Sequence, residues 1–240
     1  LGDVESPIVI LAVIPMNAIL GFSTLIDREA NNPAHVRDYN RKIATSGQHL
    51  LGLINDVLDL SKLEADKMDL APEFLNVKEF LNNIAKIFLS LAKSKNLKFR
   101  LDFSETLPRQ LKFDRKRLRQ VLVNILGNAF KFTETGGITF TAGFHAESEK
   151  HGDFTVAIRD TGPGMSQEEI NELFVPFKQH HVRDAEGTGL GLVISRRLTE
   201  RMGGGGHMNV AGAQLKDISM EMACERIRDT LKEMKESGEI

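Results

Sequence analysis

The chain has 240 residues, and its 31 lysines and arginines nearly balance 33 aspartates and glutamates, which gives a formal net charge of −2. That balance excludes the strongly basic profile of nucleic-acid-binding proteins and gives no attraction to an anionic membrane surface. With 41% hydrophobic and 27% charged residues, the composition is that of a folded protein rather than a disordered one. The single cysteine, Cys224, cannot form an internal disulfide, so a reducing, cytoplasmic location is expected.

Residues 1–68 have the pattern of a helical hairpin. Apolar residues at three-four spacing after Pro15 predict one helix, and Pro33 begins a second helix with a broad apolar stripe. Two helices alone cannot bury both stripes, so we expect the hairpin to dimerise into a four-helix bundle. The alternative is that the hairpin packs against the rest of its own chain. The longest apolar run, 8–16, is too short to span a bilayer, so no direct membrane contact is expected.

Residues 69–204 mix helical and strand patterns, which predicts an α+β domain with helices on one face of a mixed or mostly antiparallel sheet. Helices are expected over residues 77–92, 115–131, 167–173 and 190–202. Strands are expected over residues 97–103, 137–144 and 154–160. The remaining residues, 205–240, begin in a glycine run and continue to a predicted helix over 218–235, whose role the sequence does not indicate.

The predicted helix over 115–131 carries a polar stripe between apolar residues. Asn124, Asn128 and Lys131 are four and three residues apart, so their side chains share one face. Burying two amides and an ammonium is costly unless a polar ligand satisfies them. A triphosphate with Mg²⁺ would do so, because an amide oxygen can bind the metal and a lysine the phosphate. Alone, such a stripe is more often simply solvated.

Two glycine-containing turns add to this pattern. Asp160 ends a predicted strand and is followed by Gly162 and Gly164, which allow a tight turn beside a flat ligand. Its carboxylate can accept a hydrogen bond from an exocyclic amine such as that of adenine. The run Gly-Thr-Gly-Leu-Gly at 187–191 opens a predicted helix, where backbone N–H groups can bind phosphate. Between the two turns, residues 173–184 read as a hydrophobic hinge and a polar lid.

In this order and spacing, these elements resemble the catalytic core of sensor histidine kinases, whose ATPase fold is shared with gyrase and heat-shock chaperones. Residues 124–133 look like the family's N box, 160–165 its G1 box, 174–177 its F box and 187–191 its G2 box. Upstream, residues 15–23 are similar to the second half of its H box and 46–62 to its second dimerisation helix. The resemblance runs from Pro15 to Gly204 and implies a dimeric helical hairpin followed by a Bergerat-type α/β sandwich.

The resemblance also implies ATP and Mg²⁺ as cofactors. Asn128 would bind the metal with Asn124 beside it, and Lys131 would contact phosphate. Asp160 would recognise adenine by accepting a hydrogen bond from its exocyclic amine. The other nucleotide-binding positions that the resemblance implies are Phe132, Gly162, Gly164, Lys178, Gly187, Thr188, Gly189, Leu190 and Gly191. The expected activity is phosphorylation of a histidine from Mg·ATP, followed by transfer to an aspartate of a response-regulator receiver domain.

The sequence departs from the family pattern in two places. Counting back from Pro15, the phosphoacceptor histidine falls on Ile10 and its acidic neighbour on Leu11, and neither side chain can act as nucleophile or base. After Gly204, the two strands that normally complete the sheet are not evident. The chain is therefore either a degenerate kinase or one whose sequence is discontinuous at these two places.

As an alternative function, it could be a non-phosphorylating nucleotide-binding module that dimerises with and regulates another kinase. A chaperone-like or repair-type ATPase is the least favoured reading, because of the hairpin.

Overall fold

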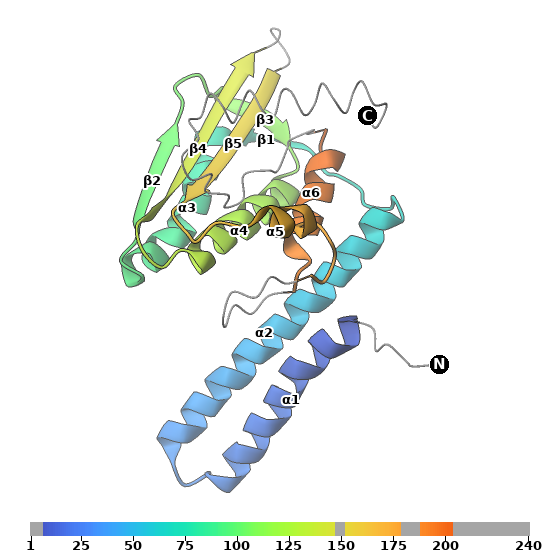
Figure 1. Ribbon diagram of the computed structural model, residues 1–240, viewed down its shortest axis with the longest axis vertical. Helices are drawn as coiled ribbons and strands as arrows, with labels where there is room; N and C mark the ends of the chain where they lie inside the picture. The colour runs from blue at the N-terminus through green and yellow to red at the C-terminus, as the bar shows by residue number, and fades with distance from the viewer. Residues whose placement is uncertain (1–6, 147–151, 179–187, 204–240) are drawn as a thin grey trace.

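Figure 1 shows the computed structural model, which describes residues 7–146, 152–178 and 188–203. A long helical hairpin carries a mixed α/β domain at one end. The hairpin consists of two helices, and the domain that follows contains five strands and four helices among the described residues. The predicted order of a hairpin before an α+β domain is confirmed. The helix predicted over 218–235 lies outside the described residues.

The hairpin consists of α1 (Pro7–Arg28) and α2 (Pro33–Glu64), which pack against each other along their length (Figure 1). Asn32 caps α2, because its side chain accepts a hydrogen bond from the backbone N–H of Ala34 at 3.2 Å. α1 begins eight residues earlier than the pattern after Pro15 predicted, and Pro15 lies inside the helix. The Pro15 ring is buried, which offsets part of the cost of the missing backbone hydrogen bond.

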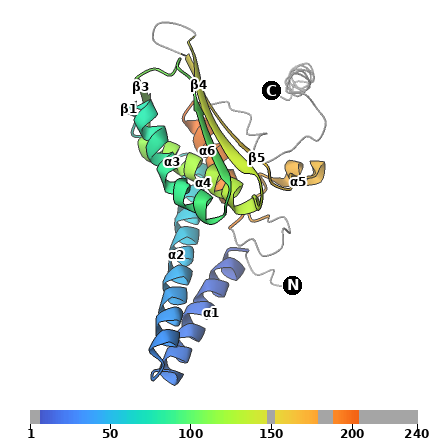
Figure 2. The same cartoon turned by 90° about the vertical axis from the view of Figure 1, so that its left-hand side faces the viewer.

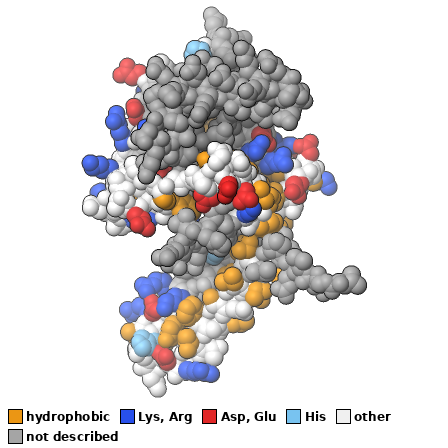
Figure 3. All heavy atoms as spheres, in the orientation of Figure 1, with side chains coloured by type: hydrophobic (Ala, Val, Ile, Leu, Met, Phe, Trp, Pro, Cys, Tyr) orange, Lys and Arg blue, Asp and Glu red, His pale blue; other side chains and the backbone are white. Residues whose placement is uncertain are grey.

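Much of the hairpin's apolar surface is exposed in the single chain. Figure 3 shows hydrophobic side chains gathered along it. The exposed apolar residues are Val9, Val13, Ile14, Met16 and Leu20 on α1 and Leu51, Ile54 and Leu58 on α2. The window Leu11–Arg28 is also long and apolar enough to cross a membrane by length and composition, with a mean hydropathy of 1.2 and 6% of it buried. The short run at 8–16 did not predict this. In the structure, that window is one arm of an amphipathic hairpin.

The α/β domain contains two small sheets. Its elements are β1 (Glu73–Asn76), α3 (Val77–Ser94), β2 (Lys98–Phe103), β3 (Gln110–Phe113), α4 (Arg115–Phe132), β4 (Gly137–Ala146), β5 (Gly152–Asp160), α5 (Gln167–Glu172) and α6 (Gly191–Arg201). One sheet has the order β2-β4-β5, in which β2 is parallel and β5 antiparallel to β4; β1 and β3 form a separate antiparallel pair. The predicted helices and strands are confirmed. The sequence missed β1 and β3, because four residues are too few to show an alternating pattern.

The main core lies between the larger sheet and the helices α3 and α4, which cover one of its faces (Figure 2). Ile138, Phe140 and Ala142 alternate along β4 and are all buried on that face. Phe130 of α4 is fully buried, stacked on Phe88 with the ring centroids 5.2 Å apart. Burial of such aromatic side chains dominates the stability of a core of this size and holds α4 rigidly against the sheet.

A second core joins the hairpin to the α/β domain. Leu60 of α2, Val121 of α4 and Leu190, Ile194 and Leu198 at and along α6 are all buried together. Therefore the carboxyl end of α2 does pack on the rest of its own chain. The apolar residues farther down the hairpin stay exposed, so this packing does not replace the predicted dimer.

Candidate nucleotide-binding site

The helix α4 carries the N-box residues, and two polar contacts fix its start. The Asp114 carboxylate accepts hydrogen bonds from the backbone N–H groups of Arg117 at 3.0 Å and Ala71 at 2.9 Å. Burial raises the pKa of Asp114, but the backbone hydrogen bonds outweigh this effect, so the pKa is lowered overall. The Arg117 guanidinium also binds Asp59 of α2 at 3.0 Å, with both side chains largely buried. The Arg117–Asp59 pair thereby joins the start of α4 to the hairpin.

The three polar residues of the N box do not behave alike. The Asn124 amide donates a hydrogen bond to the Ser195 hydroxyl on α6 at 2.9 Å. Asn128, one turn later, is half-buried and has no hydrogen-bond partner among the residues that the structure describes. The Lys131 ammonium lies 5.1 Å from the centroid of the Phe132 ring. Asn128 is therefore the residue of the three whose oxygen remains available to a metal ion. Asn124 instead connects α4 to α6 by its hydrogen bond to Ser195.

The G2-box glycines allow α6 to approach α4 and the F box. A Cβ atom on Gly191 would lie 2.4 Å from the Asn124 amide oxygen. Gly189 has φ +68°, and a Cβ there would lie 2.9 Å from the Phe177 backbone. No side chain caps α6 at Leu190, and uncapped N–H groups at the start of a helix are donors suited to a phosphate. Leu190 itself is fully buried in the second core, which anchors this end of the helix.

The G1-box turn lies beside the end of α4. Asp160 ends β5, and its Oδ1 accepts a hydrogen bond from the Gly162 backbone N–H at 2.8 Å. Its second oxygen has no partner among the described residues and can accept one from a base. A Cβ on Gly162 would lie 2.8 Å from Asp160 Oδ1 and 3.1 Å from the Phe132 carbonyl oxygen, so any side chain there would force these neighbours to shift. Gly164 has φ +73°, a conformation that favours glycine.

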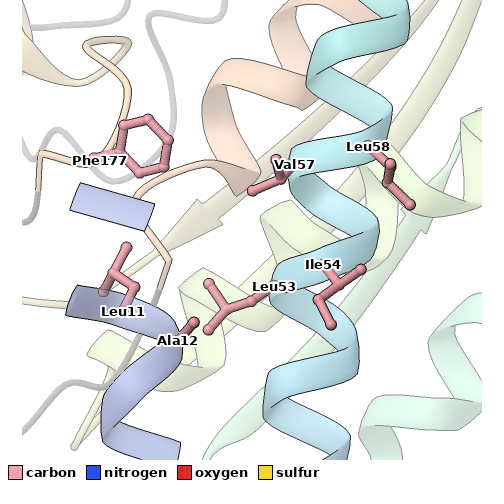
Figure 4. A pocket seen from close by; sticks show the side chains of 7 residues that line it. All are labelled: Leu11, Ala12, Leu53, Ile54, Val57, Leu58 and Phe177. Atoms are coloured by element: carbon pink, nitrogen blue, oxygen red, sulfur yellow. The ribbon is translucent and has the colours of Figure 1, made fainter. Parts of the chain in front are cut away.

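The F box reaches the hairpin. Phe177 lines a cavity of about 150 Å³ together with Leu11 and Ala12 of α1 and Leu53, Ile54, Val57 and Leu58 of α2 (Figure 4). Leu11 is the neighbour of Ile10, so the structure brings the F box close to the helix turn where the phosphoacceptor was expected. Lys178, a predicted nucleotide contact, forms an ion pair with Glu172.

Sequence reasoning missed a hydrogen bond between the G2 box and the hairpin. The Thr188 hydroxyl donates to the Asp56 carboxylate of α2 at 3.2 Å and accepts from the Leu190 backbone N–H at 3.0 Å. Burial raises the pKa of Asp56; the hydrogen bond from Thr188 lowers it, and the charge of Asp59 raises it further. The sequence signal was the position of Asp56 one turn before Leu60 on the apolar face of α2.

The structure therefore brings the four predicted boxes together. G1 touches the N box through Gly162 and Phe132, G2 touches the N box through Gly191 and Asn124, and F touches G2 through Phe177 and Gly189. Gly187 and the predicted lid lie outside the described residues. Within the described ranges, no cluster of three or more His, Cys, Asp or Glu side chains could hold a metal ion. Any Mg²⁺ would thus rely on Asn128 and on the phosphates themselves.

Two family profiles match the chain. Residues 14–66 match the His Kinase A (phospho-acceptor) domain, and residues 113–229 match the histidine kinase-, DNA gyrase B-, and HSP90-like ATPase. The first match begins after Ile10 and Leu11, the two positions that depart from the H box. The second continues past Gly204, where the sequence resemblance was expected to end.

Several known sensor kinases are similar to this chain. The sensor protein GacS of Pseudomonas syringae pv. syringae is 40% identical over 194 residues, which is 79% of this chain and 21% of that protein. The chain thus spans about a fifth of the length of the curated relatives it matches. Among solved structures, full-length ShkA in complex with AMPPNP has a TM-score of 0.61 and 30% identity, over 82% of this chain and 41% of that one. The kinase ThkA, solved in complex with the response regulator TrrA, shares the fold, with a TM-score of 0.57 and 22% identity over 80% and 52% of the two chains.

Proposed function

This chain belongs to the sensor histidine kinases, and from that membership we propose that its described part binds Mg·ATP at the meeting point of the four boxes. The observation that carries the proposal is the close approach of Gly191 to Asn124, since a Cβ atom on Gly191 would lie only 2.4 Å from the amide oxygen. That approach places the uncapped start of α6 beside the N box. An uncapped helix start next to the Asn124 amide suits an anionic phosphate chain.

Each end of the nucleotide has its own residues in this proposal. Asp160 accepts a hydrogen bond from the exocyclic amine of adenine through its second oxygen, which has no partner in the described part of the chain, and the Gly162–Gly164 turn leaves room for the flat base. Asn128 binds Mg²⁺, and Lys131 together with the start of α6 contacts the phosphates. The site therefore contributes alignment and neutralisation of charge, which is the main protein contribution to phosphoryl transfer.

Titration calorimetry with Mg·AMPPNP tests the base-binding part of this proposal. We expect the unmodified chain to bind and Asp160→Asn to bind about tenfold or more weakly, because an amide in place of the carboxylate loses a charge-assisted hydrogen bond. Glu134→Gln, which changes an exposed acid directly after the N box, is the matched control and should bind as the unmodified chain does. Equal affinity of Asp160→Asn and the unmodified chain would contradict the role of Asp160.

The reaction class that we propose is transfer of the γ-phosphoryl group to a histidine and onward to an aspartate of a response-regulator receiver domain, on the cytoplasmic side of the cell. ThkA supports the second step, since it was solved in complex with a response regulator. At position 10, this chain has isoleucine, whose side chain has no nucleophilic nitrogen. That residue favours a second candidate function, in which the chain binds nucleotide and regulates a partner kinase without being phosphorylated itself.

A homodimer through the hairpin is also part of the proposal. Leu20, Leu51 and Leu58 are more than half exposed in the single chain, and a second copy would cover them. We expect Leu51→Glu combined with Leu58→Glu to convert a dimer into a monomer, because the charges would be buried unpaired in a four-helix bundle. Sedimentation velocity measures the change. Lys62→Glu, an exposed position on the same helix, should leave the dimer intact. If the unmodified chain were a monomer in this measurement, the proposed homodimer would be contradicted.

A further inference from the structure

We infer that Asp56, a residue of the hairpin, is part of the nucleotide site and weakens the binding of the phosphate chain while it holds the G2 box against α2. This inference rests on the proposed function and names a residue that controls the affinity of that same site. No nucleotide-binding box contains Asp56, which lies 132 residues before its partner Thr188 in the chain.

Two consecutive hydrogen bonds connect the Asp56 carboxylate to the start of α6. Oδ2 of Asp56 lies 3.2 Å from the Thr188 hydroxyl, and that hydroxyl oxygen lies 3.0 Å from the Leu190 backbone nitrogen. Leu190 is the cap residue of α6, whose first N–H groups are the proposed phosphate donors. The carboxylate therefore lies close to the place where the most negative part of the ligand would bind.

The surroundings of Asp56 make this negative charge effective. Asp59 lies one turn further along α2, but it is ion-paired with Arg117 and also accepts a hydrogen bond from Gln120 at 2.9 Å. No cation is paired with Asp56 among the described residues; its one hydrogen bond there comes from the neutral Thr188. The partial burial that raises the pKa of Asp56 also reduces the screening of its field by water.

The contact links nucleotide binding to the position of the hairpin. Phosphate oxygens and the Asp56 carboxylate would compete for the Thr188 hydroxyl and would repel each other across the start of α6. Coupling between two binding events is reciprocal. If docking of the hairpin lowers the affinity for the ligand, then binding of the ligand must weaken the docking of the hairpin. The hydrogen bond between Thr188 and Asp56 is thus a contact that Mg·ATP would release and that an empty site would keep.

The test compares two ligands that differ in their phosphates. Mg·AMPPNP and adenosine are titrated into the unmodified chain and into Asp56→Asn, which keeps the shape and the acceptor oxygen but removes the charge. We expect Asp56→Asn to bind Mg·AMPPNP about three- to tenfold more tightly, because it removes a nearby negative charge that water screens only in part. Adenosine should bind both proteins equally. Asp27→Asn, an exposed position at the far end of α1, is the control for net charge and should change neither affinity.

The outcomes distinguish failure of the inference on Asp56 from failure of the proposed nucleotide binding. Equal binding of Mg·AMPPNP by the unmodified chain and Asp56→Asn would overturn the inference and leave the proposed function intact. An equal gain for adenosine would also overturn it, because it would indicate general loosening of the site. Absence of nucleotide binding in both proteins would overturn the proposed function as well.

A second measurement needs no variant. It uses the ¹³C resonance of the Asp56 carboxyl group, which should shift with Mg·AMPPNP and not with adenosine.

Discussion

Replacing Asn128 by alanine is expected to weaken the binding of Mg·AMPPNP by about 30- to 100-fold. Asn128 is half-buried on α4, and its amide has no partner in the described part of the protein. Because the Asn124 amide is hydrogen-bonded to Ser195, the Asn128 oxygen is the one that we propose binds Mg²⁺. Loss of a contact to a charged group costs about 2 to 3 kcal/mol, which corresponds to that range of affinity. The stability of the protein should change little, because alanine favours a helix and leaves no buried group unpaired.

Omission of the metal separates the role of Asn128 from a change in shape. Calorimetry in Mg²⁺ and again in EDTA should show a large difference between Asn128→Ala and the unmodified chain only when Mg²⁺ is present. Asn83→Ala, an exposed asparagine on α3, is the matched control and should bind normally in both conditions. An equal loss of affinity with and without Mg²⁺ would mean that Asn128 contacts the nucleotide itself and not the metal.

Replacing Ile10 by histidine is expected to produce a phosphorylated protein where the unmodified chain gives none. An imidazole supplies the nucleophilic nitrogen that isoleucine lacks. Ile10 precedes Leu11, which lines the same cavity as Phe177 of the F box, so position 10 is near the ATP-binding domain within one chain. We leave Leu11 unchanged, because a glutamate there would place a carboxylate in an apolar cavity. After incubation with radioactive Mg·ATP, acid-labile label should rise at least about tenfold above background, equivalent to lowering the effective barrier by about 1.4 kcal/mol or more.

The control for this gain is a histidine elsewhere on α1. Val13→His puts the same side chain at an exposed position one turn further along the helix, and it should remain unlabelled. If Ile10→His binds Mg·AMPPNP but takes up no phosphate, position 10 is not the phosphoacceptor position, and the second candidate function is favoured. Addition of a receiver domain to the labelled protein would then show whether the phosphoryl group passes to an aspartate.

Most of the secondary structure could be predicted because it follows from local periodicity. The hairpin, α3, α4 and the larger strands all have enough residues to show a three-four or an alternating pattern. β1 and β3 were missed because a strand of four residues gives too little pattern. The early start of α1 was missed because Pro15 looked like a boundary, whereas its ring is buried inside the helix.

The candidate site was predictable as a set of short motifs but not as a set of contacts. The order of Asn128, Asp160 and the glycines identified the family, and the structure then placed the boxes side by side. The different roles of Asn124 and Asn128 could not be read from the sequence, since both lie on the same face of α4. What distinguishes them is Ser195 of α6, 71 residues away from Asn124.

The sequence by itself determined the two-part architecture, the family and the residue types available to a nucleotide, because these depend on periodicity and on motifs within a few residues of each other. The tertiary structure alone decided that Asp56 lies beside the start of α6, that Phe177 reaches α1, and that Asp59 compensates Arg117. Each of these contacts joins the hairpin to the ATPase domain. Their partners are far apart in the chain, so they depend on the angle at which the two domains pack, and that angle is determined by the buried side chains of the second core.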